Sequence, residues 1–354
     1  MDIKTFFVFL FDIIIITAFR FFKSKESKMR YIPSYQLNIF PEENFAAQII
    51  SVEEKLGEIV NSGSFTAFDG VNIHYEYFLA ENSRGNVVIV HGLSEFTKKF
   101  YEIIYYTLNQ GYNVFIYDQR CHGLSGRLTD ERDLLHVDSF NDYVKDLNYF
   151  IDEIVLKTEN KPIYLFAHSM GGAIAALYLS EQSSKIKSAV LSAPMFEPIV
   201  KNVPTLIARE GLRVGKVIFG GKRKFFLSEE FNPETKFHYT YGLSEARFKK
   251  NMKLRCENEM YQSTPMSFGW VRGSLTVGKR ILSRRIIGKI ETPILIISAR
   301  EDKMVNNKMQ EQFFSRCKNC EFESIEHATH AILSSDEVIL SKVLKLTFDF
   351  LSRA

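Results

Sequence analysis

The sequence predicts an α/β fold, with a mostly parallel central sheet, helices on both faces of the sheet and an inserted helical cap. Short apolar runs typical of buried strands alternate with helix-like segments along most of the chain. This alternation stops between residues 195 and 289, where the sequence becomes basic and aromatic. The 354 residues, 45% of them hydrophobic, are enough for one large core and a cap inserted above it.

The first parallel strands of the predicted sheet lead into glycine-containing turns. The apolar run 85–90 ends in His91-Gly92-Leu93, a turn that can present a backbone N–H, and we expect the amide of Leu93 to be an oxyanion donor. The run 112–117 ends in a polar turn that contains His122, which we expect to be structural.

The segment 166–172 seats a serine between a strand and a helix. Residues 162–167 are typical of a short buried strand, and a helix of small residues begins near Gly171. Ser169 lies in the turn between them, where its hydroxyl would stand at the top of the sheet. The N–H of Met170 would face developing negative charge at the start of the helix. Both features favour acyl transfer, although the short motif alone is only moderately specific.

A nucleophilic serine needs a base and an acid that orients the base. The run 292–299 predicts another buried strand, and Asp302 follows directly at its carboxyl end. In a parallel sheet this is the edge at which Ser169 is expected. Asp302 could instead be an ordinary loop residue or helix cap, and Glu301 is a weaker competitor for the same role.

The base is expected in a later loop, after a helix near 306–317 and a short strand near 322–325. His327 and His330 both lie there. We predict His330, because it lies further into the loop and directly precedes the apolar run before the last helix. The order Ser, Asp, His, each after a strand, is the chain order of one class of serine hydrolase triad.

Taken together, these segments resemble the α/β-hydrolase superfamily, and within it the lysophospholipase and monoacylglycerol lipase group called serine aminopeptidase S33-like hydrolases. The resemblance runs from about Phe65 to the C-terminus. Its motifs are the His-Gly-Leu-Ser-Glu turn, the Asp-Gln-Arg-Cys-His-Gly-Leu-Ser-Gly segment and the His-Ser-Met-Gly-Gly elbow. Ala167 and Cys121 stand where the family usually has glycine. The segment 265–274 resembles the end of the cap in bacterial lysophospholipase L2-type proteins.

The resemblance implies that Ser169 is the nucleophile, His330 the base and Asp302 the orienting acid, with the amides of Leu93 and Met170 as oxyanion donors. It implies cleavage of carboxylic esters of lipids, lysophospholipids or monoacylglycerols, through an acyl-serine intermediate and without a cofactor or metal. A peptidase or small-ester hydrolase would use the same triad. A non-catalytic binding or scaffold protein on the same fold is the remaining alternative.

The predicted cap, 195–289, is both apolar and basic, with Lys-Arg-Lys-Phe-Phe at 222–226. Such a cap would suit a substrate with an acyl chain and an anionic headgroup, although a solvated helical lid has the same composition. The formal net charge of +3 is too small to favour a nucleic-acid partner. Cys317 and Cys320 have ligand-like spacing, but the sequence offers no second pair to complete a zinc site.

The N-terminal segment 1–22 is strongly apolar and is followed by Lys23 and further basic residues. We expect a membrane anchor or span, although the length is marginal and Asp12 near its centre is costly. A signal peptide is the main alternative. The following basic residues would keep the catalytic domain cytoplasmic. Residues 23–63 are expected to link this anchor to a hydrolase domain at 64–354, or to pack on the sheet.

Overall fold

The computed structural model describes residues 29–200 and 205–354, which contain an eight-stranded sheet with strand order β1-β2-β4-β3-β5-β6-β7-β8. The pairs β1/β2 and β2/β4 are antiparallel, and all other neighbours are parallel. The predicted α/β class is therefore confirmed. The strands are β1 (Asn61–Thr66), β2 (Asn72–Phe78), β3 (Asn86–Val90), β4 (Asn113–Tyr117), β5 (Ile163–His168), β6 (Ile186–Ser192), β7 (Ile294–Ala299) and β8 (Cys320–Ile325).

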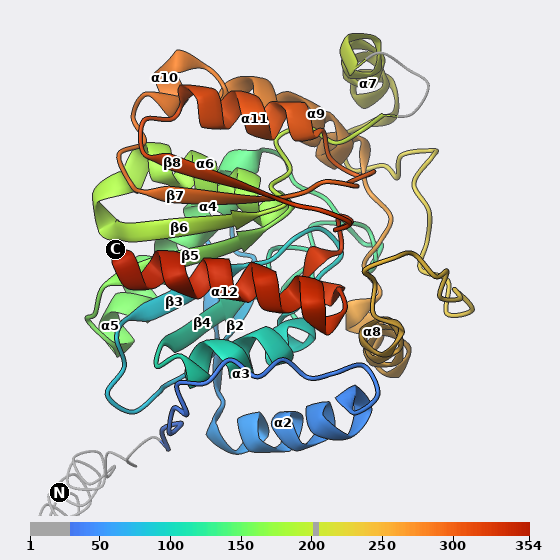
Figure 1. The fold of residues 1–354 in the computed structure, drawn as a ribbon. Helices are drawn as coiled ribbons and strands as arrows, with labels where there is room; N and C mark the ends of the chain where they lie inside the picture. The colour runs from blue at the N-terminus through green and yellow to red at the C-terminus, as the bar shows by residue number, and fades with distance from the viewer. Residues whose placement is uncertain (1–28, 201–204) are drawn as a thin grey trace, which may run out of the picture.

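Helices cover both faces of the sheet (Figure 1). In β3, Val87 and Ile89 belong to one buried cluster and Val88 and Val90 to another, because successive side chains of a strand point to opposite faces. The first cluster includes residues of α2 (Phe45–Ile59), α3 (Tyr101–Asn109) and α12 (Glu337–Arg353). The second includes residues of α4 (Phe140–Tyr149), the π-helix η2 (Phe150–Val155), α6 (Met170–Gln182) and α11 (Asn307–Arg316). The short elements are η1 (Thr97–Phe100), α5 (Leu156–Thr158), η3 (Ser183–Lys185) and η5 (Ile332–Ser334).

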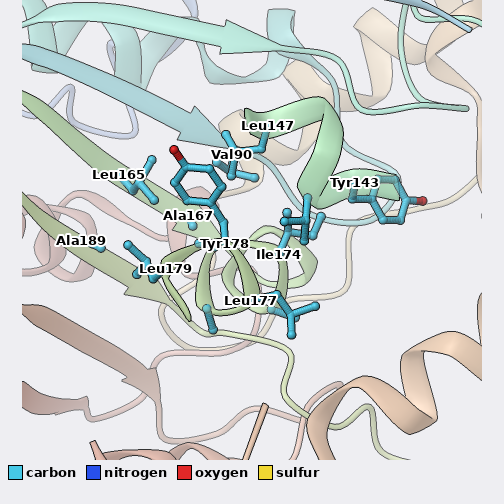
Figure 2. Close-up of a cluster of buried hydrophobic side chains, with 14 of the residues drawn as sticks. Val90, Tyr143, Leu147, Leu165, Ala167, Ile174, Leu177, Tyr178, Leu179 and Ala189 are labelled. Atoms are coloured by element: carbon cyan, nitrogen blue, oxygen red, sulfur yellow. The ribbon is translucent and has the colours of Figure 1, made fainter. Parts of the chain in front are cut away.

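Helix α6 is buried on all sides, and Figure 2 shows its side chains packed among those of the neighbouring strands. This close approach explains its small residues. A Cβ added at Gly171 would lie 2.0 Å from the Val90 carbonyl oxygen, and one at Gly172 would lie 2.6 Å from Cβ of Pro194. Glycine at both positions therefore allows the start of α6 to sit directly against the sheet.

The segment 23–63 is described from residue 29 onward, and this part packs on the body of the protein. Helix α2 buries Phe45 and Leu56 in the same cluster as α3 and α12. The Tyr31 N–H donates to the Leu79 carbonyl at 2.7 Å, and the Tyr31 hydroxyl donates to Asn109 at 2.8 Å. From residue 29 onward the segment therefore packs on the body, the alternative to a linker, and residue 64 lies inside strand β1.

The predicted N-terminal anchor, 1–22, lies outside the described residues. Within 29–200 and 205–354, no helix is both long and apolar enough to cross a bilayer.

The predicted cap lies between β6 and β7 and divides into two parts. Figure 1 shows α7 and α8 at the side toward which the parallel strands run. By contrast, Trp270 and Ile281 of α9 are buried in the main core, so the end of the insertion belongs to the helix layer of the body. The elements are α7 (Thr205–Phe219), α8 (Glu245–Glu257), η4 (Glu259–Tyr261), α9 (Phe268–Ile281) and α10 (Arg284–Ile287).

Candidate active site

Ser169 lies in a sharp turn between β5 and α6. Its backbone has φ 51° and ψ −118°, a conformation that few residues other than glycine adopt. Its N–H donates to the Ser192 carbonyl at 3.0 Å, and its own carbonyl accepts from the Met195 N–H at 2.8 Å. These bonds, to the last residue of β6 and to the segment that follows it, hold the strained turn. Ala167 lies two residues before Ser169, at the position where the family usually has glycine. Its methyl group is accommodated there, and the residue is fully buried in the core.

The predicted acid and base lie beside this serine. Oγ of Ser169 is 2.8 Å from Nε2 of His330, and Nδ1 of His330 is 2.7 Å from Oδ2 of Asp302. The other carboxylate oxygen of Asp302 accepts from the Met304 and Val305 N–H groups at 2.8 and 2.9 Å. With Nδ1–H donated to a fixed, buried carboxylate, Nε2 remains to accept the serine proton.

The competing residues, Glu301 and His327, form a pair of their own. Nδ1 of His327 lies 3.2 Å from Oε1 of Glu301, and both side chains are exposed. His327 also has a positive φ of 61°, because the chain turns sharply there before it reaches His330. The same loop therefore directs one histidine to solvent and the other to Ser169.

The predicted oxyanion donors flank the serine. Met170 is the first residue of α6, so its N–H has no acceptor within the helix. Leu93 follows Gly92, and a Cβ built on Gly92 would lie 3.0 Å from Cβ of Ser169. The turn after β3 is thus in contact with the serine, as the predicted role of Leu93 requires.

An ion pair between buried Glu95 and half-buried Lys99, beneath this turn, was not anticipated. Oε2 of Glu95 accepts from the Gly92 N–H at 2.6 Å, and its Oε1 accepts from Nζ of Lys99 at 2.6 Å. Burial raises the pKa of Glu95, but Lys99 and His168 outweigh it and lower that pKa to about 2. The available signal was the i, i+4 spacing of Glu95 and Lys99 directly after the His-Gly turn.

Two further histidines near the serine are buried. His168 precedes Ser169, and its Nδ1 lies 3.1 Å from the Ser192 carbonyl. Burial lowers the pKa of His168 to about 4, although the Glu95 carboxylate opposes this shift. His122 is fully buried, and its Nδ1 lies 2.9 Å from the carbonyl of Arg120. It therefore contacts the loop beneath the site rather than Ser169.

The polar loop before His122 contains a position with special backbone geometry. Cys121, where the family usually has glycine, has φ 63°, a region that glycine enters most easily. This positive φ explains why the family usually has glycine at this position. Cys121 adopts the same backbone conformation, and its side chain is buried. In the described ranges, no group of three or more histidine, cysteine, aspartate or glutamate side chains is placed to hold a metal ion.

Comparison with known proteins identifies related sequences. The family model described as serine aminopeptidase, S33, matches residues 81–337. Lysophospholipase L2 of Escherichia coli (strain K12) is 29% identical over 315 residues, which cover 83% of this chain and 88% of that protein. A monoglyceride lipase from Saccharomyces cerevisiae is 32% identical over 126 residues, 33% of this chain and 38% of that protein.

Solved structures agree in fold. A soluble variant of monoglyceride lipase from Saccharomyces cerevisiae, in complex with a substrate analog, has a TM-score of 0.65 at 18% identity and covers 83% of this chain and 94% of its own. A thermostable carboxyl esterase from Bacillus coagulans has a TM-score of 0.64 at 16% identity. The match covers 83% of this chain and 98% of the esterase chain. The predicted resemblance is confirmed: the chain has the α/β-hydrolase fold and belongs to the serine aminopeptidase S33 family.

Proposed function

We propose that this protein is a serine hydrolase that cleaves the carboxylic ester bond of lysophospholipids or monoacylglycerols through an acyl-serine intermediate. The observation that carries the proposal is the hydrogen-bonded row Ser169–His330–Asp302 at the carboxyl edge of the sheet. A non-catalytic scaffold would have no need to keep a strained serine, an oriented imidazole and a buried carboxylate in this register.

In the proposed mechanism, Nε2 of His330 takes the proton of Ser169 as Oγ attacks the ester carbonyl. The oxyanion that forms accepts from the N–H groups of Leu93 and Met170. His330 then protonates the departing glycerol oxygen and activates a water molecule that releases the fatty acid. Asp302 holds the imidazole in the required tautomer throughout.

The lipid substrate class is supported by the relatives, named as lysophospholipase and monoglyceride lipase, and by the cap. The exposed residues of α7 and the loop after it include large apolar side chains, with Val217 and Leu227 each 83% exposed. Exposed Lys222 and Arg223 lie between them in the sequence. An apolar face with basic neighbours suits amphiphilic substrates that carry negative charge.

The same face supports an association with membranes, and the basic residues that follow segment 1–22 favour the cytoplasmic side for the catalytic domain. The apolar segment 1–22 would provide one attachment, and the exposed face of α7 would provide a second contact with the lipid surface. Full-length protein should sediment with anionic phosphatidylglycerol vesicles, and Val217→Asp with Leu227→Asp should weaken this binding. Equal sedimentation of the two proteins at vesicle concentrations that bind only part of the wild type would contradict the contact through α7.

The catalytic proposal is tested by labelling with a fluorophosphonate probe. The full-length protein should be labelled and the folded Ser169→Ala variant should not. Fatty-acid release from lysophospholipids, monoacylglycerols, short esters and aminoacyl substrates then decides the substrate class. No labelling of folded protein would favour a scaffold role, and preferential cleavage of aminoacyl substrates would favour a peptidase.

A further inference from the structure

We propose that Glu95 is a positioning residue for the oxyanion hole: its carboxylate fixes the turn after β3 so that the Leu93 N–H faces the reacting carbonyl, while Lys99 neutralises that carboxylate. The inference rests on the proposed function, because it concerns the same acyl-transfer step. It assigns a role to an ion pair of a buried carboxylate and a half-buried ammonium, which takes no part in the proton transfers of the triad.

The geometry of Gly92 carries the first step. Glu95 is buried, and its Oε2 accepts from the Gly92 N–H at 2.6 Å. A Cβ at Gly92 would lie 2.9 Å from that oxygen and 3.0 Å from Cβ of Ser169. Both groups therefore border the side of Gly92 on which a side chain would stand, and the carboxylate of Glu95 holds the Gly92 N–H at the point where the turn meets Ser169.

The orientation of the next peptide group carries the second step. The Gly92 carbonyl is 2.8 Å from Nδ1 of His91, whose Nε2 accepts from the Gln119 N–H at 3.0 Å. Nδ1 of His91 must therefore be the donor to Gly92. In a planar trans peptide, the N–H points opposite to the C=O. His91 holds the carbonyl of Gly92, and Glu95 holds the N–H of Gly92. Because the Leu93 N–H belongs to the same peptide group as the Gly92 carbonyl, its direction is fixed before substrate binds.

Electrostatics explain why Lys99 accompanies Glu95. A buried carboxylate beside an oxyanion hole would repel the negative charge that develops on the substrate. Nζ of Lys99, 2.6 Å from Oε1, offsets that charge. The low pKa of Glu95, about 2, means that the carboxylate remains ionised at neutral pH and needs this partner continuously.

This arrangement distinguishes the two roles of the carboxylate. Glu95→Gln keeps an oxygen that accepts from Gly92, so we expect kcat within about 3-fold of wild type. Glu95→Ala removes the acceptor and should lower kcat by roughly 10- to 100-fold with little change in KM, below the full loss of an oxyanion donor. Lys99→Met should lower kcat about 10-fold, and adding Glu95→Gln should restore most of this loss because no buried charge remains.

The experiment measures kcat and KM on p-nitrophenyl butyrate, and the affinity for a trifluoromethyl ketone that forms an oxyanion on Ser169. Lys98→Met is the matched control, because its ammonium lies over the Tyr101 ring instead of pairing with Glu95. The inhibitor affinity should fall in parallel with kcat in Glu95→Ala and Lys99→Met, and remain unchanged in Lys98→Met.

Thermal unfolding of each variant separates this loss from misfolding, and Glu95→Gln covers the case in which Glu95→Ala does not fold. The proposal is overturned if Glu95→Ala keeps the kcat and inhibitor affinity of wild type, or, where Glu95→Ala does not fold, if adding Glu95→Gln to Lys99→Met restores none of the lost kcat. Stoichiometric fluorophosphonate labelling of wild type is scored separately. If wild type is not labelled, the proposed function fails. If wild type is labelled and the kinetic result that overturns the proposal is found, only the role of Glu95 fails.

Discussion

At the scale of single residues, the two loop histidines give a direct test of the triad. His330 lies against Ser169 and Asp302, whereas His327 is exposed and paired with Glu301. We expect His330→Ala to lower kcat by roughly 10³-fold or more, because triad members act as a unit. His327→Ala should stay within about 3-fold of wild type, since the removed side chain touches none of the reacting groups. Ester hydrolysis by the two purified variants measures this, and the reverse order would exchange their roles.

The sequence predicted these side chains because each follows a strand of a parallel sheet. The carboxyl ends of such strands meet at one edge, so Ser169, Asp302 and His330 could be placed together without coordinates. The role of Glu95 was not predicted from the sequence, although Glu95 also follows a strand. Its role depends on where its side chain points after a turn, and Ser94, which precedes it, has φ 58°. Periodicity carries no information about such a turn.

At the scale of elements, glycine distinguishes a helix that must approach the sheet from one that need not. A Cβ at Gly171 in α6 would lie 2.0 Å from the Val90 carbonyl, whereas nothing lies within 4 Å of a Cβ at Gly57 in α2. Gly171→Ala should therefore destabilise the fold by about 1–3 kcal/mol or more through overpacking. Gly57→Ala should stabilise it by about 0.5–1 kcal/mol through helix propensity. Urea unfolding of both variants measures these shifts, and equal signs would contradict the packing argument.

Helix α2 shows what a reading of composition overlooks. Its buried residues Phe45, Ile49, Val52, Leu56 and Ile59 recur at helical spacing, within a segment whose many polar residues suggested a linker. Strand β1 gave still less signal, because it lies at the edge of the sheet and only Phe65 of it is buried. The central strands were predictable because they are apolar on both faces, whereas edge elements show only half of that pattern.

The burial of α2 gives a second prediction at this scale. Leu56 is completely buried among residues of α3 and α12. Leu56→Ala should lower the free energy of unfolding by about 2–5 kcal/mol, as for other large-to-small changes in a core. Ile50→Ala is the matched control, because Ile50 lies on the exposed side of the same helix. A linker that contributes nothing to the fold would show equally small changes for both.

At the scale of the whole molecule, a buried ion pair joins the cap to the body. Arg247 of α8 donates to Glu102 of α3 at 2.7 Å and to the Phe40 carbonyl at 2.9 Å. Arg247→Met leaves the Glu102 carboxylate buried without its cation and should cost about 3–5 kcal/mol. Lys249→Met, which removes an exposed pair with Glu245 on the same helix, should cost no more than about 1 kcal/mol. Denaturant unfolding compares them, and similar values would mean that α8 is held by other contacts.

Buried histidines weaken the folded state of the whole molecule in acid. Burial lowers the pKa of His91, His122, His136 and His168, that of His168 to about 4. The unfolded chain holds histidine near its ordinary pKa of about 6.5, so between pH 4 and 6.5 it binds more protons than the folded state. The contribution of these histidines to stability therefore falls as pH falls through this window, whereas Asp146, whose pKa burial raises to about 6, acts in the opposite direction.

For His168 alone, the two pKa values correspond to a loss of about 2 kcal/mol between pH 7 and pH 5. His168→Asn keeps an amide that can donate to the Ser192 carbonyl but cannot be protonated. Its free energy of unfolding should consequently fall less than that of wild type over the same pH range. Urea titrations of both proteins at pH 7, 6 and 5 measure the difference, and identical pH dependence would mean that His168 is solvated in the folded protein.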